Sequence, residues 1–136
     1  AYINGTVRTF DPRVRAMVEV RLRDIVAGQA LAYGVAAVLD LERGYPPTVN
    51  DPAEAAFAVA VAQQIAPRVT ADAAREMGSE DFAFFLEKIP GAYLFIGNGD
   101  SAGLHHPAYD FDDRTAPYGA SLLARLVERA QPLPTA

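Results

Sequence analysis

The spacing of apolar residues predicts a strand, a helix and a second strand at the start of the chain. Residues 2–10 set β-branched and aromatic residues between polar ones, which is the pattern of a strand. Asp11 and Pro12 then predict a helix start, as N-cap and first helical residue. Apolar residues follow at helical spacings of three and four: Val14, Met17, Val18, Leu22 and Ile25. Gly34 is expected to end this helix, and residues 35–43 predict another strand, so this part indicates half of a small layer of sheet and helix.

A linker is predicted in the middle of the chain. Two prolines stiffen residues 44–50 into an extended path. Asp51 follows as the expected N-cap of a second helix, with Glu54 at the capping-box position. This helix is expected to stop before Pro67.

The last part of the chain predicts two more helices and a buried strand. Ser79 is expected to cap a short helix, and residues 91–97 have the continuous apolar character of a buried strand. A glycine-rich loop follows the strand. A final helix is predicted with its buried face made of Leu122, Leu123, Leu126 and Val127. Strands and helices in this order predict an α/β fold.

The glycine-rich loop contains both histidines of the chain, His105 and His106, and the chain has no cysteine. A metal hydrolase site needs several nitrogen, sulfur or carboxylate donors around one or two ions. In an extended Leu-His-His-Pro segment one histidine can enter a site while the other faces away. Such a pair is more often plain surface loop, but loops after the carboxyl ends of strands are where α/β proteins place their sites. We therefore expect the chain to supply part of a metal site.

Two other groups of charged residues have open interpretations. Arg8 lies among apolar strand residues, where it can pair with a structural acid or clamp a substrate carboxylate. Glu80 and Asp81 fall in the predicted first turn of a helix, where acids complement the helix dipole. A carboxylate there can also assist a nearby metal or its water.

Composition and charge exclude several classes of function. The net charge of −5 and the mixed signs of the arginine-rich region argue against a nucleic-acid surface. The loop lacks the spacing of a P-loop, and no serine lies in a nucleophile-elbow pattern. No signal peptide and no membrane-spanning apolar run are recognisable, and a cysteine-free chain fits a reducing cytoplasm. The chain opens on a strand-like run without an initiator Met, as if it belonged to a longer protein.

Five segments, read in order over about residues 2–128, resemble the carboxy-terminal part of the M20 metallopeptidase and amidohydrolase family. The branch most similar contains hippurate hydrolases, N-acyl-amino-acid amidohydrolases and auxin-conjugate hydrolases. The matching segments are residues 5–10 (Gly-Thr-Val-Arg-Thr-Phe), 45–51 (Tyr-Pro-Pro-Thr-Val-Asn-Asp), 77–82 (Met-Gly-Ser-Glu-Asp-Phe), 90–93 with 97–99, and 104–107 with 109–111.

The resemblance implies a two-domain enzyme. Residues 1–46 are then the second half of a ferredoxin-like (α+β) lid that also forms a homodimer. Residues 47–136 are the end of a zinc-peptidase-like α/β catalytic domain. The resemblance also implies two divalent metal ions, drawn from Zn, Mn, Co and Ni.

The resemblance assigns few roles to individual residues. His105 matches the family's metal-ligating histidine, and His106 stands where members often carry Asn or Ser. Arg8 is placed towards the substrate carboxylate. The general-base Glu is expected upstream, so no catalytic residue is assigned in this chain, and Glu80 does not match the motif. We expect no amidase activity from these 136 residues alone.

Three hypotheses follow for the function. The first is part of a cytoplasmic, metal-dependent amidohydrolase that hydrolyses N-acyl amino acids, with hippurate-like substrates, by metal-activated water. The alternative is a non-catalytic dimerisation module or truncated remnant, held by strand edges at residues 2–10 or 35–43. A small-ligand binding protein that uses the glycine loop ranks last.

Overall fold

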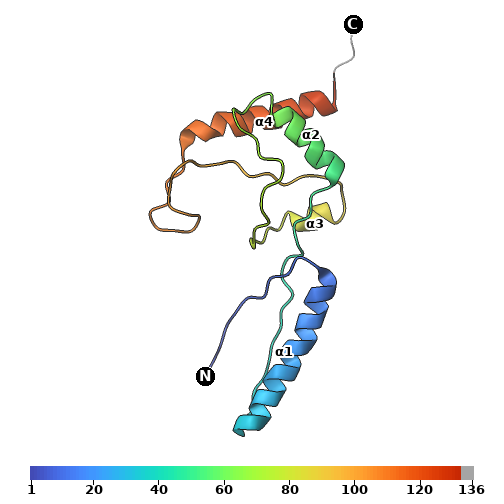
Figure 1. Ribbon diagram of the computed structural model, residues 1–136, viewed down its shortest axis with the longest axis vertical. Coiled ribbons are helices and arrows are strands. Elements are labelled where there is room, and N and C mark those ends of the chain that lie inside the picture. The colour runs from blue at the N-terminus through green and yellow to red at the C-terminus, as the bar shows by residue number, and fades with distance from the viewer. Residues whose placement is uncertain (133–136) are drawn as a thin grey trace. The chain divides into compact units, whose positions relative to one another are not determined.

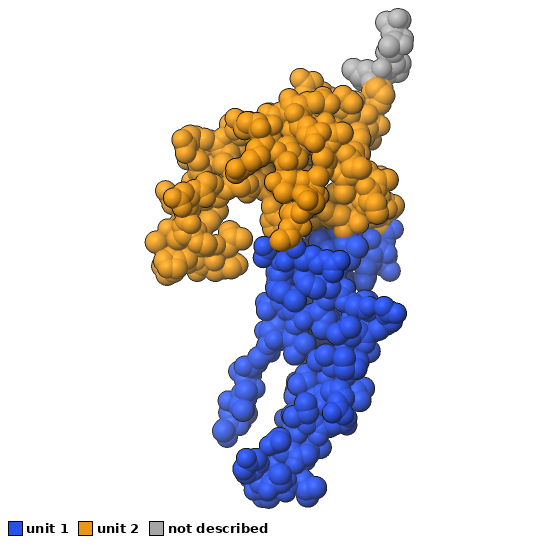
Figure 2. Space-filling view, in the orientation of Figure 1, with its two compact units in different colours: residues 1–49, 75–88 blue, residues 50–74, 89–136 orange. Residues whose placement is uncertain are grey.

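A computed structural model of the protein describes residues 1–132, and the regular structure of these residues is helical (Figure 1). Its elements are α1 (Pro12–Tyr33), α2 (Pro52–Ala62), α3 (Ala83–Leu86), the 3-10 helix η1 (Asp113–Thr115) and α4 (Ala116–Ala130). They divide between two compact units (Figure 2). Unit 1 comprises Ala1–Val49 and Arg75–Lys88, and unit 2 comprises Asn50–Ala74 and Ile89–Ala136. The division between residues 49 and 50 falls inside the predicted linker.

Both predicted ends of α1 are confirmed. The Asp11 carboxylate accepts a hydrogen bond from the Arg13 backbone N–H at 2.7 Å, with Pro12 at the first helical position. Gly34 ends the helix in the left-handed conformation with φ 61°. The Val35 N–H donates to the Ala30 carbonyl at 3.0 Å, which completes the six-to-one bond of a Schellman cap.

The predicted apolar stripe of α1 is only partly covered by the described residues, with Val18 and Leu22 half-buried. No residue of α1 is buried, and Met17 and Ile25 are more than half exposed. No helix within residues 1–132, α1 included, has the length and the apolar run that crossing a membrane requires.

Polar contacts and ring contacts hold the rest of unit 1 to α1. Arg43 donates to the Glu19 carboxylate through two nitrogens, at 2.7 and 2.9 Å, and Arg15 donates to the Gly44 carbonyl at 3.2 Å. The Tyr45 and Phe84 rings meet edge to face at a centroid distance of 5.8 Å. These contacts bring the start of the predicted linker against α1 and α3.

The predicted start of α2 is confirmed, but only half of the expected capping box forms. The Asp51 carboxylate accepts from the backbone N–H groups of Ala53 and Glu54, at 2.9 and 3.1 Å. The Asp51 N–H donates instead to the Gly91 carbonyl, at 2.9 Å. A backbone acceptor from another segment therefore takes the place expected for the Glu54 side chain.

Helices α2 and α4 pack together in unit 2 (Figure 1). Ala58 and Val61 of α2 are buried. The predicted apolar face of α4 is only partly covered. Leu122 and Leu126 are half-buried, whereas Leu123 and Val127 are exposed.

The predicted cap at Ser79 is wrong. Helix α3 begins only at Ala83, after Phe82 as N-cap, and no side chain caps it. The Ala83 N–H donates to the Glu80 carbonyl at 3.2 Å, so Glu80 and Asp81 lie in a turn before the helix. Because α3 has no acid in its first turn, the helix-dipole interpretation of these two acids does not hold.

The three predicted strands, at residues 2–10, 35–43 and 91–97, do not form within residues 1–132. The sheets expected for a zinc-peptidase-like α/β domain and a ferredoxin-like lid are therefore not confirmed. β-branched and aromatic residues are common in strands because they pack well on a half-buried pleated surface. Their presence does not specify which segment pairs with the strand. A strand needs a neighbour that completes its ladder of hydrogen bonds, and no described segment pairs in this way.

Many apolar side chains of the described chain are exposed to solvent. The chain exposes 11539 Å², whereas a folded monomer of 14.6 kDa exposes about 6,900 Å². The buried apolar residues of the described chain are small: Ala58, Val61 and Ala83. Ile3 and Val38, in two of the predicted strands, are each 96% exposed. These exposed apolar side chains are available for contact with other protein.

The Glu19 carboxylate generates a prediction for acid stability. Its hydrogen bond with Arg43 lowers the pKa of Glu19 below the ordinary 4.5. A lowered pKa in the folded state contributes stability that is present above pH 4.5 and is lost as the pH falls through the folded value. Glu19→Gln should therefore lower stability at neutral pH and flatten its decline in acid, measured by urea unfolding from pH 7 to 3.

The matched control is Glu42→Gln, because Glu42 makes no ion pair among the described residues. This variant should retain the steep acid decline. A decline in Glu19→Gln as steep as in the wild type would contradict the role of the pair.

Candidate functional site

His105 lies in a tight turn in unit 2. The His106 N–H donates to the Gly103 carbonyl at 3.1 Å, which closes a turn with Leu104 and His105 at its centre. His105 has φ 66° and is the one residue other than glycine with a positive φ among those described. This position of such a turn normally takes Gly or Asn. The expected extended Leu-His-His-Pro segment is therefore wrong, because the backbone folds back on itself at His105.

A second turn follows at once and uses His106. The Tyr109 N–H donates to the His106 carbonyl at 2.9 Å, with Pro107 at the favoured second position of the turn. The Ala108 N–H donates to the His106 Nδ1 at 3.0 Å. Nδ1 is therefore the acceptor within this turn. His106 thus supports the turn through its side chain.

The His105 imidazole is exposed and makes no hydrogen bond or ion pair within residues 1–132. A neutral imidazole with an available nitrogen is the commonest metal ligand in proteins. The described residues nevertheless contain no group of three His, Cys, Asp or Glu side chains that could hold a metal ion. They fit the donation of one ligand by His105 and do not fit a complete metal centre.

Side chains close the base of the loop that carries His105, drawn in brown in Figure 1. The Asn98 amide donates to the Asp110 carbonyl at 2.6 Å and accepts from the Asp112 N–H at 2.8 Å. The Ser101 hydroxyl also contacts Asp110, accepting from its N–H at 3.2 Å and donating to its carbonyl at 3.1 Å. These contacts tie residue 98 to residues 110–112.

The Asp112 carboxylate stabilises the exit from the loop. It accepts from the Arg114 side chain at 2.8 Å and from the Arg114 N–H at 3.0 Å, which caps η1. These bonds, the side-chain one first, lower the pKa of Asp112 below the ordinary 3.8. The carboxylate therefore stays charged and keeps the segment after the loop in place.

Arg8 lines a groove of unit 1 with a volume of about 640 Å³, together with Glu19, Arg43 and residues 76–79. Glu19 and Arg43 pair with each other in this groove. Arg8 is exposed, and its guanidinium makes no hydrogen bond or ion pair within the described chain. The structure thus does not support a structural acid as the partner of Arg8.

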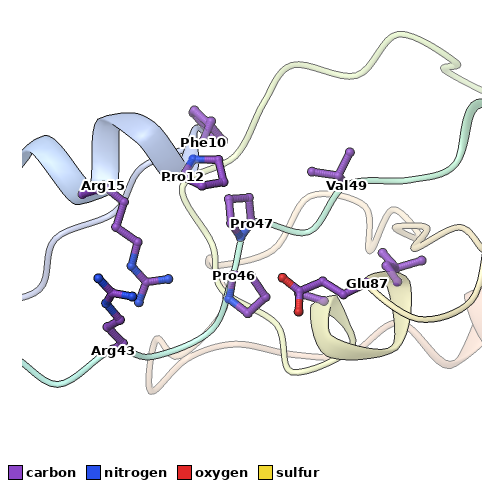
Figure 3. Close-up of a pocket in the computed structure, with 11 residues that line it drawn as sticks. Phe10, Pro12, Arg15, Arg43, Pro46, Pro47, Val49 and Glu87 are labelled. Carbon is purple, nitrogen blue, oxygen red and sulfur yellow. The ribbon is translucent and has the colours of Figure 1, made fainter.

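A smaller pocket of about 340 Å³ lies in the same unit (Figure 3). Arg15 and Arg43 are on one side of it and Glu87 is on the other, with Pro46 and Pro47 between them. Both arginines have partners, because Arg43 pairs with Glu19 and Arg15 donates to backbone carbonyls. This pocket offers no unpaired cation to a ligand.

The sequence did not reveal the roles of Asn98 and Asn50. The Asn50 amide donates to the Tyr93 carbonyl at 2.9 Å and accepts from the Tyr93 N–H at 2.8 Å. An asparagine side chain can bond a backbone segment in this way because it has both a donor and an acceptor. The signals for Asn98 were its position between two glycines and its place in a segment that resembles the family, and neither indicates the segment it bonds.

The backbone conformation of His105 generates a prediction for stability. A non-glycine residue in the left-handed region costs about 1–2 kcal/mol, and glycine does not pay this cost. His105→Gly should therefore be more stable than His105→Ala by about 1 kcal/mol, measured by urea unfolding. At Leu104, which does not have a positive φ, the order should be reversed. Equal stability of the two His105 variants would contradict the strained turn.

Nearly the whole chain matches a known protein family. Residues 5–129 match the family described as Peptidase family M20/M25/M40. The chain is 36% identical over 111 residues to the N-acetyl-L-cysteine deacetylase of Bacillus subtilis (strain 168), covering 82% of this chain and 26% of that protein. It is 32% identical over 126 residues to the N-acetylcysteine deacetylase of the same strain, covering 93% of this chain and 33% of that protein.

A third relative is the N-acetyldiaminopimelate deacetylase of Streptococcus sanguinis (strain SK36), 28% identical over 129 residues, with 94% of this chain and 34% of that protein covered. No solved structure matches the chain. The chain spans about a third or less of the length of these curated relatives. Because the family match extends from residue 5 to residue 129, the chain belongs to peptidase family M20/M25/M40.

Proposed function

We propose that this chain is the carboxy-terminal part of a metal-dependent amidohydrolase that hydrolyses the amide bond of N-acyl amino acids. Family membership and relatives named as deacetylases of N-acetylated amino acids support this proposal. The observation that carries it is the exposed His105 imidazole on a strained turn. Strained backbone on this scale persists where the surrounding contacts enforce it, and it gathers at functional sites.

His105 acts in this proposal as one ligand of a metal centre whose other ligands come from further residues of a longer enzyme. A bound divalent ion supplies Lewis acidity, which polarises an amide carbonyl and acidifies water. The contribution of this chain is to present the His105 imidazole from a turn in the left-handed conformation. No residue of the chain is proposed as general base, and two ions, of Zn, Mn, Co or Ni, remain part of the proposal.

Arg8 is proposed to bind the carboxylate of the substrate. It lines the larger groove of unit 1 without a carboxylate partner in the described chain. A guanidinium can donate two parallel hydrogen bonds to a carboxylate, which gives both orientation and affinity. An N-acyl amino acid carries one such carboxylate beside its amide bond.

The acyl group of the substrate is proposed as a class and not as one group. A hippurate-like substrate carries an aromatic acyl group, whereas the relatives above are named for N-acetyl substrates. The common feature is an acyl group on the nitrogen of an amino acid, and the proposed function is limited to that class.

The domain assignment also belongs to the proposal. Residues 1–46 are proposed as half of a lid that forms a homodimer, and residues 47–136 as the end of a catalytic domain, in a cytoplasmic enzyme. Exposed apolar residues in 2–10 and 35–43 support a partner surface there. The same observation favours the second candidate, a non-catalytic dimerisation module, which predicts a stable dimer without metal.

The metal-ligand assignment is tested in the longest natural chain that contains this sequence. His105→Ala should lower metal affinity and hydrolysis of an N-acetyl amino acid by at least about 100-fold, because loss of an outer-shell partner alone costs 10–100-fold. Metal content by elemental analysis and initial rates measure both effects. His106→Ala is the neighbouring control and should retain most of the metal. Full metal content and turnover in His105→Ala would rule out the assignment.

The Arg8 assignment is tested with a pair of substrates. Wild-type enzyme should prefer an N-acetyl amino acid over its carboxamide by about 10–100-fold in kcat/KM, since a hydrogen bond to a charged group contributes about 1.5–3 kcal/mol. Arg8→Ala should remove this preference and raise KM for the acid. Arg23→Ala removes the same charge from unit 1 outside the groove and should leave the preference intact. An unchanged preference in Arg8→Ala would exclude the clamp.

A further inference from the structure

The Asn98 side chain makes hydrogen bonds to the backbone that a neighbouring strand would make in a sheet. One amide accepts from the Asp112 N–H at 2.8 Å and donates to the Asp110 carbonyl at 2.6 Å, so it pairs with two backbone groups on the same segment. Antiparallel strands exchange backbone hydrogen bonds in a comparable alternation. Asn98 is half-buried, so these bonds are partly withdrawn from competition with water.

Packing does little to hold the loop that this amide closes. Residues 103–108 are all exposed, including Leu104, which is 71% exposed. The conformation of the loop must therefore depend on hydrogen bonds and on turn preferences. Ser101 adds a second contact to Asp110, so the carbonyl of Asp110 accepts from two side chains.

A continuous path of bonds runs from Asn98 to the turn at His105. Asp110, which Asn98 and Ser101 hold, follows Tyr109 directly in the chain. The Tyr109 N–H donates to the His106 carbonyl, and the His106 N–H donates to the Gly103 carbonyl. The second of these bonds closes the turn in which His105 has φ 66°. The turn with His105 at its centre is thus connected through residues 106, 109 and 110 to the side chains that close the base of the loop.

We propose that Asn98 is a positioning residue for His105: by closing the base of the loop it fixes the backbone at His105 and so the direction of the imidazole. The effect on metal binding rests on the proposed function of His105. The effect on the loop itself does not.

Asn50 offers a matched control. Its amide makes the same two kinds of bond, at 2.9 and 2.8 Å, to the backbone of Tyr93. The segment it holds lies outside the histidine loop. A purely structural role for Asn98 predicts that the two alanine variants behave alike, whereas a positioning role predicts that they differ in metal binding.

The experiment titrates Zn²⁺ alone, in competition with a chelator, into the longest natural chain that contains this sequence. Asn98→Ala should weaken Zn²⁺ affinity by about 10–100-fold, the range for loss of a residue that orients a ligand. Asn50→Ala should lower the unfolding midpoint but stay within about twofold of wild-type affinity. Wild-type affinity in Asn98→Ala, or equal losses in both variants, would overturn the proposal.

Two further measurements keep the result decisive. If Asn98→Ala does not fold, Ser101→Ala removes the two longer hydrogen bonds to Asp110 and should weaken Zn²⁺ affinity a few-fold; no loss would count against the proposal. If His105→Ala itself leaves Zn²⁺ affinity unchanged, the proposed function fails. Hydrogen exchange then decides the role of Asn98: exchange of the His106 and Tyr109 amides should be faster in Asn98→Ala and not in Asn50→Ala. Unchanged exchange would refute it.

Discussion

Unit 2 depends on side chains that satisfy the backbone where no strand does so. Helices α2 and α4 satisfy their own backbone groups, but the segments between them need other partners, because an unpaired backbone group withdrawn from water is costly. Asn50 pairs with Tyr93, the Asp51 N–H donates to Gly91, and Asn98 pairs with residues 110 and 112. The course of the chain from residue 91 to residue 112 follows from these few bonds.

The loop that carries His105 also depends on side chains that bond to the backbone. His105 occupies a backbone conformation that its side chain disfavours, on a loop that is exposed around it. If only local backbone preferences acted, His105 would adopt a negative φ, because this change gains about 1–2 kcal/mol. The contacts of Asn98, Ser101 and His106 oppose this relaxation. The loop therefore presents an imidazole that the described chain itself does not use.

The exposed apolar surface and the single ligand are consistent with one explanation. Buried apolar residues are few and small, and no group of three metal ligands occurs in the described chain. The relatives of the family are about three or more times longer than the match. In the proposed full-length enzyme, further protein covers the apolar faces and completes the ligand set.

Local signals in the sequence were sufficient for both ends of α1, for the start of α2 and for the family. Asp11, Gly34 and Asp51 act within a few residues of their own position, and each cap forms as predicted. Glu54 and Ser79 were equally plausible as capping residues, yet the Asp51 N–H donates to the Gly91 carbonyl instead of Glu54, and no side chain caps α3. The strand patterns were recognisable too, but a pattern of β-branched residues does not specify its partner.

By itself, the sequence determined the termini of α1, the start of α2, the family and the histidine to be tested. These depend on contacts between near neighbours or on the identity of residues in order. Only the tertiary structure decided that His105 lies in a left-handed turn and that Asn98 holds its loop. The reason is physical: those features depend on hydrogen bonds between residues 98 and 110–112, which are separated in sequence, and an exposed loop has no apolar periodicity that would predict them.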